Sequence, residues 1–159
     1  MLTKPVHRKH RVSERTSDDF TIKTIATDDF AKSIYDFIFE NMRGAITATK
    51  TPLLPGYIDI APYGFSFFLK LLLNEIYGNG MVELNISATT KQMILTVRFS
   101  DRSVPQRIIS VAEKSGLTIS ELSDGLIIMT APICYLDSFS IYALDATDFE
   151  RHLLEIFFM

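Results

Sequence analysis

The side chains that most often carry out chemistry are few in this sequence and lie far apart. Its one cysteine, Cys134, stands between apolar neighbours, so we expect a small buried residue rather than a nucleophile or half of a disulfide. Of the three histidines, His7 and His10 lie close together and His152 is far along the chain, which is not the spacing of a zinc site. His152 could accept a phosphoryl group if it lay on an exposed helix face, but a histidine on a terminal helix is usually an ordinary surface residue.

Paired carboxylates occur at Asp18-Asp19, at Asp28-Asp29 and at Asp145 with Asp148. Such pairs can hold a metal ion, but these lie where helices are predicted to begin, and negative charge stabilises a helix start. The sequence has no Gly-x-Ser-x-Gly nucleophile elbow, and Gly78-x-Gly80 is too short for a phosphate loop and follows a predicted helix. We therefore expect no catalytic residues and no metal site of these kinds.

Composition is that of one ordinary globular domain. The 159 residues are 47% hydrophobic and 22% charged, with a formal net charge of −3. That balance does not favour binding to nucleic acid or to an anionic membrane. We expect a flexible basic arm over residues 1–17 and a single domain over residues 18–159. A lone cysteine, with no signal peptide and no spanning segment, is typical of a cytoplasmic protein.

Hydrophobic periodicity predicts alternating strands and helices. Residues 20–26 alternate like a strand, and Thr27 followed by two aspartates is typical of a helix cap. Residues 45–63 are the least regular, with a turn at Pro55-Gly56. Phe68, Leu71, Leu72 and Ile76 are expected to be buried. The remaining predicted elements are a strand at 57–61, a helix at 65–77 stopped by Gly78-Asn-Gly80, strands at 81–87 and 92–99, a helix from Pro105 to Ser115-Gly116, strands at 117–122 and 126–131, a strand at 138–143, and a last helix capped by Asp145 or Thr147.

This interleaving favours an α+β fold. The pairs 81–87 with 92–99 and 117–122 with 126–131 have the spacing of antiparallel hairpins. We therefore predict a two-layer α/β sandwich, in which a mixed, mostly antiparallel sheet has its helices on one face.

The order of elements from Phe65 to Pro132 resembles the ATP-binding domain of sensor histidine kinases, the GHKL or Bergerat fold. Leu71-Leu-Leu-Asn-Glu-Ile-Tyr-Gly is similar to the family's N-box helix, and Leu95-Thr-Val-Arg-Phe-Ser-Asp101 to the strand that delivers its adenine-binding aspartate. The resemblance implies that Asn74 would help hold magnesium against the phosphates. It also implies that Asp101 would accept a hydrogen bond from the exocyclic amine of adenine.

The sequence departs from that family where the nucleotide would be enclosed. The family has Asp-x-Gly-x-Gly, and this chain has Asp101-Arg-Ser-Val-Pro105. Only a few residues separate Asp101 from the next helix, too few for a glycine-rich lid. Glu75 also occupies the place after Asn74 where the family has a small residue. Asn74 and Asp101 are thus predicted to be a vestigial nucleotide site, or simply a helix-end and a strand-end polar residue.

The resemblance and these departures together predict a degenerate histidine-kinase-like domain that acts in signalling or regulation by binding a protein partner or a second copy. No cofactor is expected, ATP and magnesium binding being weak or lost, and enzymatic activity is not favoured. Residues 138–158 and the N-terminal arm would then be partner or dimer surfaces. Three alternatives stay open: a ligand-binding or catalytic protein with a pocket that the sequence does not reveal, a functional ATP-binding protein, and a structural α+β domain.

Overall fold

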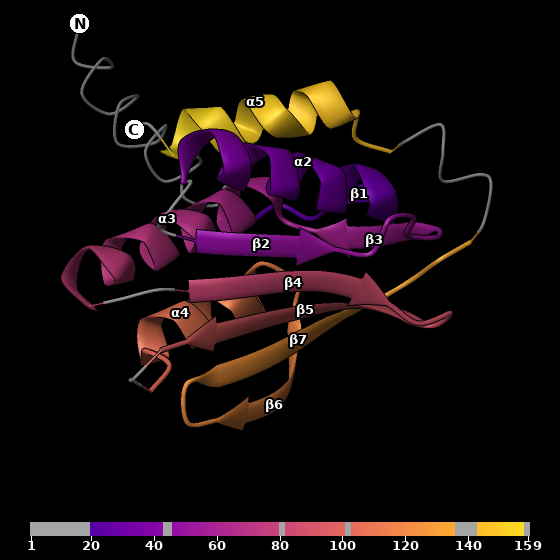
Figure 1. The fold of residues 1–159 in the computed structure, drawn as a ribbon. Helices are drawn as coiled ribbons and strands as arrows, with labels where there is room; N and C mark the ends of the chain where they lie inside the picture. The colour runs from indigo at the N-terminus through magenta and orange to yellow at the C-terminus, as the bar shows by residue number, and fades with distance from the viewer. Residues whose placement is uncertain (1–19, 43–45, 80–81, 101–102, 136–142, 158–159) are drawn as a thin grey trace, which may run out of the picture.

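The computed structural model describes residues 20–42, 46–79, 82–100, 103–135 and 143–157. They form a two-layer α+β structure in which helices cover one face of a five-stranded sheet, as predicted (Figure 1). A small two-stranded sheet lies beside the main one. None of the helices in these ranges is long and apolar enough to cross a membrane.

The main sheet is mixed. Its strand order is β2-β4-β5-β7-β6, and β2 runs parallel to β4 while every other neighbouring pair is antiparallel. The strands predicted at 81–87, 92–99, 117–122 and 126–131 all lie in this sheet, which confirms that prediction. The strand bounds are Ile46–Lys50 for β2, Val82–Ala88 for β4, Gln92–Phe99 for β5, Thr118–Ser123 for β6 and Leu126–Pro132 for β7.

The helices pack against one face of this sheet because alternate strand residues point toward them. Every second residue of β4, β5 and β7 is buried in the same cluster as the apolar sides of the helices. The intervening residues of β4 and most of those of β5 and β7 are exposed or half-buried. The helix bounds are Thr27–Asn41 for α2, Pro62–Asn79 for α3, Gln106–Lys114 for α4 and Ala146–Phe157 for α5.

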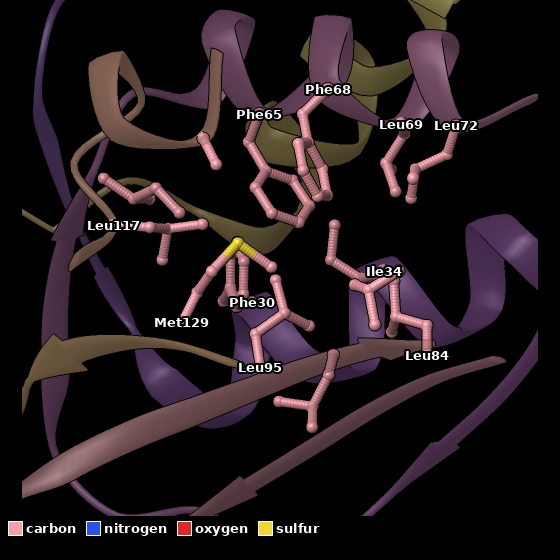
Figure 2. Packing of buried hydrophobic residues seen from close by; sticks show 14 of the residues in the cluster. Phe30, Ile34, Phe65, Phe68, Leu69, Leu72, Leu84, Leu95, Leu117 and Met129 are labelled. Carbon is pink, nitrogen blue, oxygen red and sulfur yellow. The ribbon is translucent and has the colours of Figure 1, made fainter. Parts of the chain in front are cut away.

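The centre of the core is aromatic and is built mainly by α3. Figure 2 shows Phe65, Phe68, Leu69 and Leu72 pointing from α3 toward the core, with α2 and the strands supplying the opposite walls. The ring of Phe30 in α2 meets the ring of Phe65 edge to face, with centroids 4.9 Å apart. Phe68, Leu71 and Leu72 are buried as predicted. The side chain of Ile76, the fourth residue of that prediction, lies outside the described part of the structure.

The small sheet joins the beginning of the chain to its end. Strand β1 (Lys23–Ala26) pairs with β3 (Tyr57–Ile60) in antiparallel register. Cys134 then pairs with Tyr57 along the other edge of β3, through two backbone hydrogen bonds of 2.8 Å. Leu144 pairs with Ile25 along the other edge of β1. The chain that follows β7 therefore flanks this sheet on both sides.

Three local predictions were wrong. Residues 46–50 form strand β2, although the region around them was expected to be irregular. Thr27 does not cap α2: the capping position is Ala26, and the Thr27 N–H donates to the Gly56 carbonyl at 2.9 Å instead. Helix α3 continues through Gly78 to Asn79, past the expected stop.

Of the two residues predicted to cap the last helix, Asp145 and Thr147, the structure agrees with Asp145. Asp145 accepts a hydrogen bond from the Thr147 N–H at 3.0 Å, so the aspartate caps α5. The strand predicted at 138–143 lies almost wholly outside the described residues. The apolar side of α5, with Phe149 and Leu153, is buried inside the chain against α2 and α3.

Candidate functional site

Of the two residues of the predicted nucleotide site, only Asn74 lies in the part of the chain that the structure describes. Asn74 lies on α3, where its side chain is exposed while those of Leu71 and Leu72, three and two residues earlier, are buried. Asp101 lies outside the described residues. The structure therefore places Asn74 on the surface and leaves the role of Asp101 as a prediction.

The connection between β5 and α4 is short and directed into the core. Strand β5 ends at Phe99 and α4 begins at Gln106. Within the connection Val104 packs against the hydrophobic cluster. The carbonyl of Pro105 accepts hydrogen bonds from the N–H groups of Ile108 and Ile109, so the first turn of α4 starts at once. Six residues, 100–105, thus separate the end of β5 from the start of α4.

Helix α4 is held firmly against α3. Its buried residues are all in the common core, and the two helices are direct neighbours. At its end, the Ser115 hydroxyl donates to the Val111 carbonyl at 2.7 Å, and the Ser115 carbonyl accepts the Ala61 N–H at 2.9 Å. That second bond ties the end of α4 to the start of α3. The residues on the core side of α4 are Ile108, Ile109, Val111 and Ala112.

A polar hollow of about 250 Å³ lies on the opposite, outward face of the sheet. The Asn85 side-chain amide donates to the Thr49 hydroxyl at 2.6 Å on its floor. Arg98 and Glu83 approach to 4.0 Å, with side chains 59% and 66% exposed. This open hollow, with its exposed charged side chains, differs from the enclosing walls of most small-molecule sites. Its lining comprises Thr47, Thr49, Glu83, Leu84, Asn85, Thr96 and Arg98.

Sequence reasoning missed this hollow because it missed β2. The signal was present in Ile46-Thr-Ala-Thr-Lys50, which alternates apolar and polar residues and contains β-branched side chains. The threonines of that strand lie beside Glu83 and Asn85 of β4 in register, so they share one face of the sheet.

A second hollow, of about 120 Å³, lies between the small sheet and the residues after β7. In it the Thr24 hydroxyl donates to the Asp59 carboxylate at 2.6 Å. Cys134 lines this hollow and is half-buried, and thus less enclosed than expected. Neither hollow includes Asn74. No cluster of histidine, cysteine and acidic side chains that could hold a metal ion occurs among the described residues.

Among the residues that the structure describes, Asp29 and His152 have altered pKa values. Burial raises the pKa of Asp29 above its usual 3.8, and the neighbouring carboxylates Asp28 and Asp145 add to the effect. Burial lowers the pKa of His152 below its usual 6.5, against the opposing charge of Glu155. These groups lie in the helical layer, away from the connection at Val104, so neither supports a nucleotide site.

No protein-family model matches this chain, and no curated protein matches its sequence. Solved structures similar to it are segments of histidine kinases. The cytoplasmic segment of histidine kinase QseC is 14% identical with a TM-score of 0.44, covering 73% of this chain and 74% of that one. The catalytic domain of histidine kinase ThkA is 13% identical with a TM-score of 0.45, covering 71% and 95%. Acinetobacter baumannii histidine kinase AdeS is 12% identical with a TM-score of 0.44, covering 86% and 84%.

Proposed function

We propose that this chain is a cytoplasmic signalling or regulatory module of histidine-kinase-like ATPase fold, which binds a protein partner and does not turn over ATP. The observation that carries the proposal is the direct passage from β5 into α4. Residues 100–105 are the whole connection, they contain no glycine, and Val104 packs into the core.

The physical argument concerns the phosphates. Phosphoryl transfer depends on holding the phosphates and magnesium in place and on excluding water, usually under a closing loop. A connection of this length cannot close over a triphosphate, and the apolar side of α4 is already packed on α3. Asn74 alone, exposed at the surface, supplies one ligand oxygen and no enclosure. Because this argument disfavours phosphoryl transfer, we infer that the fold acts through its surface, by binding a partner.

The first test is an ATPase and autophosphorylation assay on the full chain with magnesium. We expect no hydrolysis above background and no labelled protein. Robust turnover that is lost in Asn74→Ala, but kept in Asn85→Ala, would overturn the proposal. Asn85 is a matched control because it is also an exposed asparagine, on β4 at the outer face of the sheet.

A second test asks whether any nucleotide binding survives. Amide NMR shifts are followed while adenosine or ATP is titrated into wild type and Asp101→Asn, with and without magnesium. A pure interaction module shows no shifts at millimolar ligand. A vestigial site gives a Kd of about 0.1–1 mM, with little dependence on magnesium and shifts near residues 72–80 and 97–104 that vanish in the variant. That second result would replace our proposal with a nucleotide-binding one.

A separate measurement tests the proposal that the chain binds a protein partner. Light scattering of the purified full chain reports whether it binds a second copy. Cross-linking in cells, followed by reconstitution with the purified candidate, reports a different protein. A chain that stays monomeric and forms no reconstituted complex would contradict this half and leave the ATPase result unaffected.

A further inference from the structure

The contact between α5 and α3 contains a titratable side chain in an environment unsuited to positive charge. His152 precedes the fully buried Leu153 on α5 and is itself half-buried. Its imidazole ring meets the ring of Tyr63, in the first turn of α3, edge to face with centroids 4.3 Å apart. The histidine is therefore part of the surface by which α5 is held on α3, which are direct neighbours.

One ring nitrogen of His152, Nδ1, is buried where no acceptor for a proton lies within hydrogen-bonding distance among the described residues. A neutral imidazole tolerates this, because Nδ1 then carries a lone pair while the proton sits on Nε2. A protonated imidazolium would place a charged N–H donor at the same buried position without an acceptor, which costs free energy.

The charged groups around His152 do not remove that cost. On α5, the carboxylates of Glu155 and Asp148 favour protonation, while Arg151 on α5 and Lys23 on β1 oppose it. The phenol of Tyr63 on α3 donates to Glu155 Oε2 at 3.1 Å, and Arg151 bonds the Asp148 carboxylate at 2.8 Å. Both carboxylates thus already have hydrogen-bonding partners. The burial of the ring outweighs the remaining attraction and keeps the pKa of His152 lowered.

We propose that His152 makes the packing of α5 on α3 sensitive to acid, so that protonation loosens α5 and uncovers the aromatic surface beneath it. That surface includes Phe30, whose ring stacks on Phe149 of α5 at 5.5 Å. The proposal is independent of whether the chain binds nucleotide or a partner.

The direction of the pH effect follows from comparing the pKa of His152 when α5 is docked with its pKa when α5 is released. Well above pH 6.5 the histidine is neutral in both, so the packing does not change with pH. Below pH 6.5 the released form gains a proton first, because its pKa is ordinary while that of the docked form is lowered. The docked form therefore loses relative stability as the pH falls from 6.5 through the pKa of docked His152.

The test is backbone amide exchange of the full chain at pH 7.5 and pH 5.5, corrected for the intrinsic rates. In wild type, the α5 amides are expected to lose protection at the lower pH relative to those of β5. In His152→Gln, which stays uncharged, this selective loss disappears. The double variant His7→Gln, His10→Gln removes the other two histidines and keeps the wild-type loss. Equal losses in α5 and β5, or an unchanged α5, would overturn the proposal.

A second measurement covers the case in which His152→Gln already loosens α5. The wild-type imidazole is titrated by NMR, and the α5 amide shifts should follow its midpoint, below 6.5. Glu155→Gln removes a carboxylate that favours protonation, so it should move that midpoint lower. A midpoint at or above 6.5, or α5 shifts that do not follow it, would contradict the inference.

Discussion

Replacing Gly56 is disfavoured for purely geometric reasons. Its φ of +67° lies in the left-handed region, which favours glycine. A Cβ built there would lie 2.4 Å from Ile133 Cγ2 and 2.7 Å from the Cys134 carbonyl oxygen. The same residue accepts the Thr27 N–H, so the turn also fixes the start of α2.

We therefore expect Gly56→Ala to lower the free energy of unfolding by about 3 kcal/mol or more, combining backbone strain with a clash against backbone. Urea unfolding measures this. Gly116→Ala is the matched control, because Gly116 also has a positive φ but its added Cβ meets nothing closer than 3.3 Å. Equal losses in the two variants would mean that the close contact at Ile133 does not contribute.

At the scale of elements, α3 supplies much of the buried hydrophobic core. Leu72 is fully buried on it and points toward the core (Figure 2). Leu72→Ala is expected to cost about 2–5 kcal/mol, as large-to-small core changes do. The denaturant midpoint measures the loss. Leu53→Ala, at a leucine that is 80% exposed, should change stability by less than about 0.5 kcal/mol. An unchanged midpoint for Leu72→Ala would show that α3 is peripheral.

Most elements could be predicted from the sequence because their patterns are local. The alternation in β4, β5 and β7 and the apolar run of α3 each follow from their own residues. Strand β2 was missed although its own residues alternate, because Pro52 and Pro55 follow it closely and made the whole region look irregular. Thr27 failed as a cap because its N–H finds the Gly56 carbonyl, a contact that no local pattern contains.

At the scale of the whole molecule, α5 completes the helical layer rather than standing apart from it. Phe149 is fully buried and its ring stacks on Phe30. Phe149→Ala should cost about 3–5 kcal/mol in unfolding free energy. Leu154→Ala, at a leucine 46% exposed on the same helix, should cost much less. Comparable small losses in both variants would show that α5 is dispensable for the core.

For the candidate nucleotide site, some features could be predicted from the sequence and others only from the folded structure. The missing glycines and the short connection after Asp101 could be read directly, and the structure adds that Val104 packs inward and that Asn74 is exposed. The hollow on the outer face and the setting of His152 could not be predicted. Each joins residues from elements that come together only in the folded chain, such as Tyr63 with His152.

The way in which the chain end flanks the small sheet has a consequence for synthesis on the ribosome. Strand β1 is made before the main sheet, yet Leu144, its neighbour along one edge, is added only after the whole main sheet. Cys134, the neighbour of β3, also follows the whole main sheet. Contacts between such distant parts of a chain form late and slowly. Until residues 134–157 have been synthesised, the outer edges of β1 and β3 and the ring of Phe30 under α5 must stay uncovered, and this is the stage at which a chaperone would be most needed.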